Sequence, residues 1–480
     1  MFIHLFIQLY TRFSVIPMKR PWYRCFLLLG LLFLTGAQAP TASPEEIFDL
    51  AACIDRALEV SHARKAALAT LEAARAQLDE ASALRLPHIE LKTLIGPVPG
   101  ARLVHPEDPD EPLNILETTA KSRDFLNDLN LFTRTELDFV QPLYTFGKIS
   151  AALAAARGGT VARKAQLLQA ESDLRLQIMQ LYDGILLARE LSRIMEEVRK
   201  KLDSAETRLK ELLEKGSENV DQSDAAKLKV FRSKLDEQYN AIRKGEQLAR
   251  ETLEDLLDIP PDIDIALADD SLQRIDAPLL DMDHYIATAL EHRPELEALR
   301  GLLLAGDAAV DLSKADFFPE IFVAGGLRAA YAPNVEDLDN PFIPQYFRTL
   351  SLGFAVGARL SFDPLFQTKR ARLERMRANR ASLQAKADLA RVGIILEVKQ
   401  RYLELQEADR NIEAAREGYK AARSWVVSES FNYDIGVGKV KDLLEALAAF
   451  GEAKARWHQT IYDFNIGLAR LRRAVGLPIV

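Results

Sequence analysis

The sequence contains a stretch of about 69 residues, from Gly147 to Lys215, that has no proline and a composition suited to a helix. Leucine, isoleucine and valine recur along it every three or four residues, as in Ile178, Val198 and Leu202, which is typical of a coiled-coil seam. At about 1.5 Å per residue, one helix of this length extends for roughly 100 Å. Because no globular core is that wide, we expect the helix to lie in a bundle, as a rod or as the wall of a tube.

The long helix is followed by signals for a turn and a returning helix. Gly216-Ser217 predicts the turn, and apolar residues at helical spacing continue for about 40 residues after it. The second half of the chain shows the same order, with a predicted helix over 369–433 and a turn at 436–438. The chain is therefore predicted to carry two long helical hairpins.

The two halves of the chain also resemble each other in sequence. Residues 57–87 and 289–319 are both rich in alanine and leucine, and both end in a proline that precedes an alternating segment. We interpret this as an internal duplication. The predicted organisation is a first copy over 47–260, a connector over 261–282 and a second copy over 283–480.

Within each copy, the hydrophobic period changes from that of a helix to that of a strand and back. In the first copy, a helix is expected over 47–85, and a loop rich in proline, glycine and aspartate is expected from 96 to about 128. The alternating segments predict two strands in each copy, namely 89–95 and 131–139 in the first and 321–331 and 350–362 in the second.

These strands have one apolar and one polar face, as Leu352 and Phe354 alternate with Ser351 and Gly353. A transmembrane barrel gives this pattern, because one side meets lipid and the other a wet lumen, but a half-buried strand of a soluble sandwich gives it too. Since about eight strands are needed merely to fill a barrel with side chains, a pore would need strands from several chains. The predicted fold class is mainly α with a membrane β-barrel portion, built from tandem repeats of helix, strand, strand and long helical hairpin.

Residues 1–39 predict a secretory signal peptide, for which Met18 is the preferred start. Basic residues precede an apolar run of about ten residues that is too short to span a bilayer, and small residues follow it. The alternative is an N-terminal membrane anchor. The formal net charge of −8 shows no basic excess and argues against nucleic acid as a partner.

The segment after the second long helix carries the most specific pattern. It reads Tyr433-Asp-Ile-Gly-Val-Gly-Lys-Val-Lys-Asp-Leu-Leu-Glu-Ala and continues as a helix to the C-terminus. Pro-Leu-Tyr-Thr-Phe-Gly-Lys at 142–148 and Pro-Leu-Phe at 364–366 stand where the second strand of each copy meets its long helix. With these segments in the same order in both copies, the chain resembles the TolC family of outer-membrane efflux proteins over nearly all of its length after the leader.

The resemblance implies a passive channel of the outer membrane and not an enzyme. It implies a homotrimeric channel-tunnel, in which three chains supply the strands of one lipid-facing barrel and their hairpins extend into the periplasm. The implied partners are a periplasmic adaptor (membrane fusion) protein and an inner-membrane pump. Together they would form a tripartite efflux pump or a type I secretion system that carries drugs, peptides or proteins outward.

The resemblance also implies a periplasmic gate at the hairpin tips. Asp442 and Glu445 match acidic residues of that gate, and Tyr433 matches a tyrosine that helps to hold the tip closed. Asp221 is the best acidic match in the first copy, one residue out of register. Threefold symmetry would gather three copies of each carboxylate in a narrow bore, where such rings favour cations. The alternative is that these acids only stabilise helix N-termini.

The tip glycines, Gly216 and Gly436, are expected as turn residues. The resemblance places adaptor docking at both glycines and at Ile435 and Val437, which flank the second. Gly438 stands where the family's well-studied member has an arginine, with a lysine beside it.

The sequence shows no pattern typical of catalysis, cofactor binding or metal binding. Its seven histidines are scattered, without a metal-like cluster of cysteine and histidine. The competing interpretations are a periplasmic coiled-coil adaptor, which usually carries one hairpin embedded in small β-domains, and a structural protein. Neither an adaptor nor a structural protein requires two hairpins and two pairs of strands arranged as a duplication, so this arrangement argues against both interpretations.

Overall fold

The structure is a computed structural model that describes residues 45–103, 116–118, 129–215, 220–260, 263–336, 345–362 and 364–479. All of these residues belong to one compact unit, Glu45–Val480. The predicted signal peptide and the predicted turn and docking residue Gly216 lie outside the described residues.

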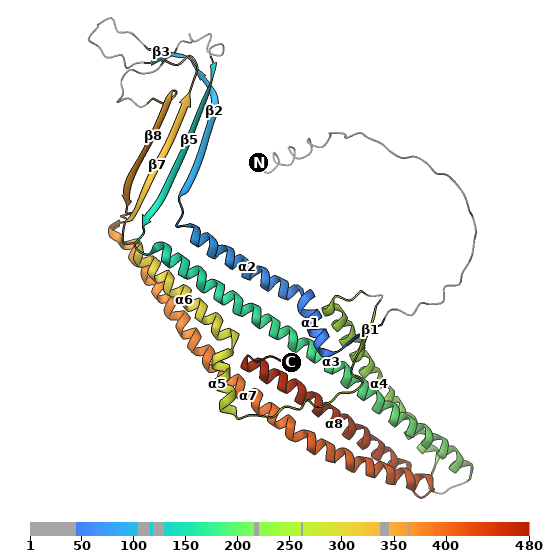
Figure 1. Ribbon diagram of the computed structural model, residues 1–480. Coiled ribbons are helices and arrows are strands. Elements are labelled where there is room, and N and C mark those ends of the chain that lie inside the picture. Colours follow the sequence, from blue (N-terminus) through green and yellow to red (C-terminus); the bar gives the residue numbers. More distant parts are fainter. Residues whose placement is uncertain are drawn as a thin grey trace, which may run out of the picture. The chain divides into compact units, whose positions relative to one another are not determined.

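Two successions of similar elements make up this unit (Figure 1). The first consists of α1 (Leu50–Val60), α2 (His62–Ala83), β2 (His88–Pro99), β5 (Leu129–Tyr144), α3 (Lys148–Glu214) and α4 (Gln222–Leu257). The second consists of α5 (Met282–His292), α6 (Pro294–Ala315), β7 (Glu320–Tyr331), β8 (Thr349–Arg359), the short 3₁₀ helix η2 (Pro364–Phe366), α7 (Gln367–Asp434) and α8 (Val440–Val475). The order of elements is the predicted one, whereas the boundaries of the two copies stay a prediction.

The four long strands form one antiparallel sheet in the order β2-β5-β7-β8. Each strand adjoins a helix in the chain, so the sheet meets α2, α3, α6 and α7 along one border (Figure 1). β2 and β8 are the two edge strands of this sheet. The sheet is therefore open within one chain.

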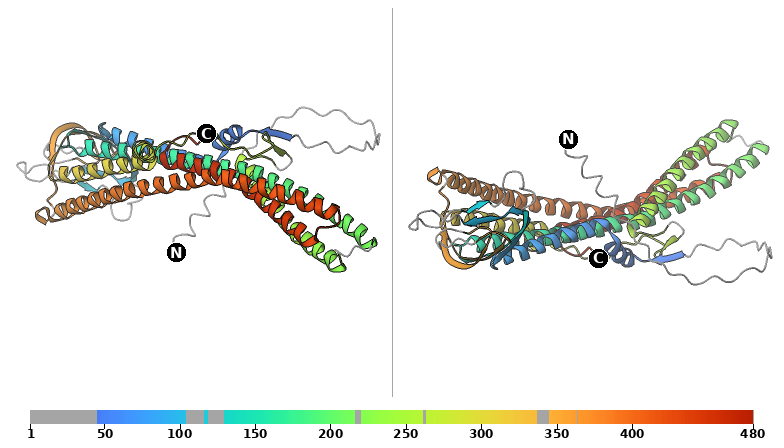
Figure 2. Two further views of the ribbon diagram at one scale, coloured as in Figure 1. Left: turned by 90° about the horizontal axis from the view of Figure 1, so that it is seen from below. Right: turned by 90° about the horizontal axis from the view of Figure 1, so that it is seen from above.

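The long helices pack side by side, and the two hairpins run along each other (Figures 1 and 2). α3 contacts α2 and α6 toward the sheet and α4 and α8 toward its far end, while α7 contacts α6 and α8. The apolar stripe predicted along the first long helix is buried, including Ile178, Ile194, Val198, Leu202 and Leu209. Among the described helices, none combines the length and apolar character needed to cross a bilayer.

A close crossing of α3 and α6 depends on two glycines. A Cβ atom at Gly158 would lie 2.4 Å from the carbonyl oxygen of Gly301, and one at Gly301 would lie 2.5 Å from that of Gly158. Any larger residue would push the helices apart, because such distances are far below van der Waals contact. Gly158 and Gly301 thus allow close packing between the two halves.

The single helix expected over 47–85 is wrong in detail. β1 (Glu45–Phe48) comes first, and the helical segment divides at Ser61 into α1 and α2. The Ser61 hydroxyl accepts a hydrogen bond from the backbone N–H of Arg64 at 3.3 Å, so it caps the new helix. In the second half the division falls at Arg293, because Pro294 cannot continue a preceding helix and instead begins α6.

The loop expected from 96 to 128 is also corrected in part. β2 continues to Pro99, and the short strands β3 (Ala101–Leu103) and β4 (Leu116–Thr118) pair with each other inside that segment. Their side chains do not follow a long alternating pattern, which is the signal that sequence periodicity detects.

The connector expected over 261–282 contains the strand β6 (Asp264–Leu267), which pairs in parallel with β1. Asn465 on α8 holds the rest of the connector, since it donates to the carbonyl of Gln273 at 2.9 Å and accepts from the N–H of Ile275 at 3.0 Å. Asn465 also donates to the carboxylate of Asp183 on α3 at 3.1 Å. Burial raises the pKa of Asp183 to about 6.

Candidate functional site

One face of the sheet is apolar and exposed within the chain. Leu91, Leu137, Leu327 and Leu352 lie side by side in register across all four strands. In the outer strand β8, the side chains of Leu352 and Phe354 are 79% and 82% exposed. Other exposed members of this face are Ile89, Ile95, Leu131, Leu350 and Val356.

The opposite face of the sheet carries a row of charged and polar side chains. Lys92, Glu136, Arg328 and Ser351 lie in register across the four strands. Arg134 Nε donates to Glu136 Oε1 at 2.7 Å, and Lys92 Nζ lies 3.1 Å from Glu90 Oε2. The sheet thus separates an apolar surface from a hydrogen-bonding one, as the alternation in the sequence predicts.

Aromatic side chains gather at both ends of the sheet. At the helix end, the ring of Phe146 lies 4.6 Å from that of Tyr144 and 5.3 Å from that of Phe318, between centroids. At the other end, the ring of Phe132 lies 5.7 Å from that of Tyr346. Such aromatic groups flank the apolar band of proteins that sit in a bilayer.

We call residues 431–445, where α7 turns into α8, the second tip. Tyr433 lies there with only 1% of its surface exposed, and its hydroxyl donates to the carbonyl of Ala205 on α3 at 3.2 Å. Burial raises the pKa of Tyr433 to about 12, so the hydroxyl stays a neutral donor. Tyr433 therefore fastens the second tip to the first hairpin.

Arg208 on α3 makes a second link that the sequence did not reveal. Its Nη2 donates to the carbonyl of Asp434 at 2.5 Å, and its Nη1 bonds to Glu211 at 2.6 Å. No local pattern could identify Arg208, because its partner carbonyl lies 226 residues further along the chain.

The turn of the second tip needs both of its glycines. Gly436 has φ of +84°, a conformation that side chains disfavour. The N–H groups of Val437 and Gly438 both donate to the carbonyl of Asn432, at 3.1 and 2.9 Å. A Cβ atom at Gly438 would lie 2.8 Å from the backbone nitrogen of Tyr433, which explains why glycine stands there. Ile435 and Val437 beside them are exposed.

The four predicted gate residues occupy different settings. Tyr433 is buried, Asp442 is half-buried in the first turn of α8, and Glu445 is exposed with Lys441 at 3.7 Å. Asp221 caps α4, since its Oδ1 accepts from the N–H groups of Ser223 at 2.6 Å and Asp224 at 3.1 Å. These hydrogen bonds, chiefly that from Ser223, lower the pKa of Asp221. The gate role of all four stays a prediction.

A groove of about 790 Å³ lies between α3, α4 and α8, close to the tips. Its apolar lining includes Met195, Val198, Leu235 and Leu447, and its polar lining includes Lys227 and Glu445. Within the described part of the chain, no group of three or more His, Cys, Asp or Glu residues is arranged to hold a metal ion.

Residues 285–477 match the family model described as outer membrane efflux protein. No curated protein matches the chain in sequence. Among solved structures, the Campylobacter jejuni CmeC outer-membrane channel has a TM-score of 0.71 at 15% identity, over 89% of this chain and 85% of that one. The Vibrio cholerae outer membrane protein VceC has a TM-score of 0.69 at 17% identity, over 90% of this chain and 97% of that one.

The Neisseria gonorrhoeae MtrE outer-membrane channel in its open state gives a TM-score of 0.68 at 16% identity, over 89% of each chain. These likenesses show the fold, and the family match covers the second half of the chain. Residues 285–477 thus resemble the outer membrane efflux protein family, and about nine-tenths of the chain shares the fold of solved outer-membrane channels.

Proposed function

We propose that three copies of this chain form one outer-membrane channel with a long periplasmic tunnel. Each chain would contribute the four strands β2, β5, β7 and β8, so that three chains close a twelve-stranded barrel. The α3–α4 and α7–α8 hairpins of the three chains would form the tunnel wall. The channel would carry drugs, peptides or proteins from the periplasm to the exterior.

The observation that carries this proposal is the contrast between the two faces of the sheet. Contact between water and the exposed row of leucines on one face is unfavourable, by roughly 25 cal/mol per Å² of apolar surface. Lipid that covers this row would remove that cost. The charged row on the other face, with Glu136 and Arg328, would be costly in lipid and is suited to a wet bore. An open sheet in one chain can satisfy both faces only when further chains close it.

The surface of α7 supports the need for neighbouring chains. Leu389, Val392, Leu396 and Leu403 are exposed and spaced three, four and seven residues apart, so they form a stripe on one side of the helix. An apolar stripe along a helix of 68 residues is stable in water only when another helix covers it. A neighbouring copy of this chain would supply that helix.

The second tip supports a gate that opens by movement of α7 and α8. Tyr433 and Arg208 join this tip to α3 through two hydrogen bonds to carbonyl groups, and loss of those bonds would free it. Asp442 and Glu445 follow in the first turns of α8, and Asp221 begins α4. In a trimer, their carboxylates would line the narrow end of the tunnel and favour cations.

The tips also support docking of a periplasmic adaptor, which would connect the tunnel to an inner-membrane pump. Ile435 and Val437 are exposed apolar residues at the second tip, and the groove between α3, α4 and α8 has an apolar floor. An amphipathic helix laid into such a groove buries its own apolar face. The channel would thus serve a tripartite efflux pump or a type I secretion system.

The test is conductance of the purified protein in planar bilayers, combined with its oligomeric state in detergent. We expect a trimer that forms cation-selective pores, and we expect Asp442→Ala with Glu445→Ala to reduce that selectivity. Glu413→Ala is the matched control, because it removes an exposed carboxylate from α7 away from the tip. A monomer without conductance would exclude the channel, and unchanged selectivity in the double variant would exclude the gate assignment alone.

A further inference from the structure

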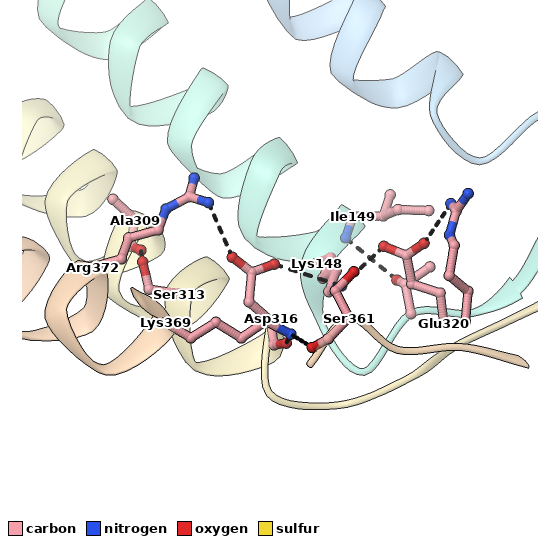
Figure 3. Close-up of polar contacts among 11 residues, drawn as sticks. Lys148, Ile149, Ala309, Ser313, Asp316, Glu320, Ser361, Lys369 and Arg372 are labelled. Carbon is pink, nitrogen blue, oxygen red and sulfur yellow. Dashed lines mark hydrogen bonds and ion pairs between the residues drawn. The ribbon is translucent and has the colours of Figure 1, made fainter. Parts of the chain in front are cut away.

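The border between the sheet and the helices holds a cluster of charged side chains that the channel proposal does not use. The cluster draws on the start of α3, the end of α6, the start of β7, the end of β8 and the start of α7 (Figure 3). We call it the junction cluster, and its members are Lys148, Asp316, Glu320, Arg359, Lys369 and Arg372.

Two carboxylates form the centre of the junction cluster. Asp316 lies between Lys148, at 3.5 Å from Nζ, and Arg372, at 3.3 Å from Nη1 (Figure 3). Glu320 accepts from Lys148 Nζ and from Arg359 Nη2, each at 2.9 Å. These ion pairs join segments that are distant in sequence. They also fix the positions of the cationic side chains around the two carboxylates.

The junction cluster has an excess of positive charge. Among the described members, four cationic side chains face two carboxylates, so their formal charges sum to +2, and Lys369 is the member without a carboxylate partner in the cluster. Lys369 donates to two carbonyl oxygens, those of Asp316 and Ser361, at 2.7 Å each, so its charge is oriented but not neutralised (Figure 3). Arg359 and Arg372 have side chains that are 70% and 53% exposed, so each guanidinium keeps N–H groups open to a further acceptor.

These side chains surround a small polar cavity of about 220 Å³. The first turn of α7 contributes Thr368 and Lys369 to the lining, and the N-cap residue of this helix, Phe366, provides no side-chain cap. The positive end of a long helix therefore adds to the charge at the same place. Exposed apolar residues lie nearby in the chain, namely Phe318 in the lining and Phe362 and Leu365 just before α7.

We propose that this cavity binds a phosphate group, presented either by the headgroup of an anionic phospholipid or by a free phosphate. Two guanidinium groups and two ammonium groups around one cavity suit an anion with several oxygen atoms, because each guanidinium donates two parallel hydrogen bonds. The site binds the phosphate between Arg359, Arg372 and Lys369, while Asp316 and Glu320 hold the cations in place and limit the affinity.

The experiment is titration of the full-length protein in neutral detergent with inorganic phosphate, at constant ionic strength set with chloride, followed by calorimetry. A second arm counts the lipids retained from nanodiscs that contain phosphatidylglycerol or phosphatidylcholine, by native mass spectrometry. We expect saturable phosphate binding, or retention of phosphatidylglycerol over phosphatidylcholine. Binding in the first arm alone assigns a free phosphate, and retention in the second assigns a headgroup.

Three variants test which residues hold the anion. Arg359→Gln combined with Arg372→Gln should weaken binding about tenfold or more, since charge-assisted hydrogen bonds are lost. Asp316→Asn should strengthen binding several-fold, because it removes a competing carboxylate and leaves the backbone carbonyl that holds Lys369 unchanged. Arg377→Gln is the control, since Arg377 pairs with Glu374 on the same helix at 2.7 Å and is not part of the cavity.

Absence of saturable binding in both arms would overturn the proposal. An equal loss in the Arg377→Gln control would overturn it as well, because that result would indicate a diffuse charge effect. Weaker binding in Asp316→Asn would also overturn it, because removal of a carboxylate that competes with the phosphate must favour an anion in this cavity. The expected gain in Asp316→Asn cannot come from a failure to fold. Neither arm needs conductance, so the result is independent of whether the protein forms an open channel.

Discussion

The two hairpins have the same order of elements, yet their tips use different chemistry. The start of α4, which we call the first tip, has a capping box in which Asp221 and Asp224 each accept from the other's backbone N–H. At the second tip, the N-cap residue of α8, Lys439, provides no side-chain cap, and the turn depends on Gly436. One tip is thus stabilised by its own side chains, and the other by contacts with α3.

This difference indicates which hairpin is free to move. The cap of α4 is local and stays intact wherever the hairpin goes. The second tip is held by Tyr433 and Arg208, and these contacts break as soon as α7 leaves α3. We therefore expect the second tip to be the moving part of the proposed gate, and the first three predictions below compare the two tips by amide hydrogen exchange in detergent.

Tyr433→Ala should have the largest effect. Loss of a buried aromatic side chain costs about 3–5 kcal/mol, so the end of α7 should exchange far faster while α4 keeps its protection. Tyr433→Phe should cost only about 1 kcal/mol, since it removes one hydrogen bond and keeps the packing. Unchanged exchange at the end of α7 in Tyr433→Ala would contradict the link to α3.

Gly436→Ala should destabilise the second tip by about 1–2 kcal/mol, because an L residue pays for positive φ. The nearest atom to the added Cβ, Leu212 Cδ2, lies at 3.5 Å, so the cost comes from the backbone and not from a clash. The control is Gly418→Ala in the interior of α7, where no atom lies within 4 Å of the added Cβ. Gly418→Ala should slow amide exchange in the interior of α7, because alanine is a better helix former than glycine.

Asp221→Ala should speed exchange of the Ser223 and Asp224 amides roughly threefold to tenfold. The pKa of Asp221 is lowered in the folded protein, so its stabilising effect is present above the unfolded value of 3.8 and is lost as pH falls through the folded value. The first tip should therefore loosen below about pH 4, whereas the start of α8 at Lys439 has no such cap to lose. Asp221→Asn keeps an acceptor oxygen and should remove this difference in pH response.

Ile435→Ser should change the stability of either tip by less than about 0.5 kcal/mol, since Ile435 is exposed. It should nevertheless weaken adaptor binding about tenfold or more, because burial of one isoleucine contributes about 1.5–3 kcal/mol. The matched control is Val427→Ser, another exposed apolar residue of α7. Equal loss in both variants, measured with the purified adaptor, would exclude specific docking at the tip.

Local patterns predicted most of the fold. The periodicity that includes Ile178 and Leu202 located α3 to within a residue at each end, and the alternation around Leu352 identified β8 and its apolar face. Both signals come from residues close together in the chain, so a short window contains them. The single helix over 47–85 was wrong because one serine cap, Ser61, is a weak signal within a good helical composition.

The candidate site was predicted less completely. Resemblance led to Tyr433 and Gly436, which the structure places at the second tip, but Arg208 carries no pattern of its own. The junction cluster was also missed, since its members come from five separate segments. The groove between α3, α4 and α8 likewise exists only once three helices are packed.

Short windows of sequence sufficed for the lengths of the long helices, the positions of the long strands and the apolar face of each strand, because propensity and periodicity act over a few residues. Three contacts follow from the packed fold alone, namely the pairing of β1 with β6, the approach of Gly158 to Gly301 and the bond from Arg208 to the second tip. These contacts join segments that are more than 140 residues apart in the chain. Their partners are chosen by packing of whole helices, and no short stretch of sequence records that choice.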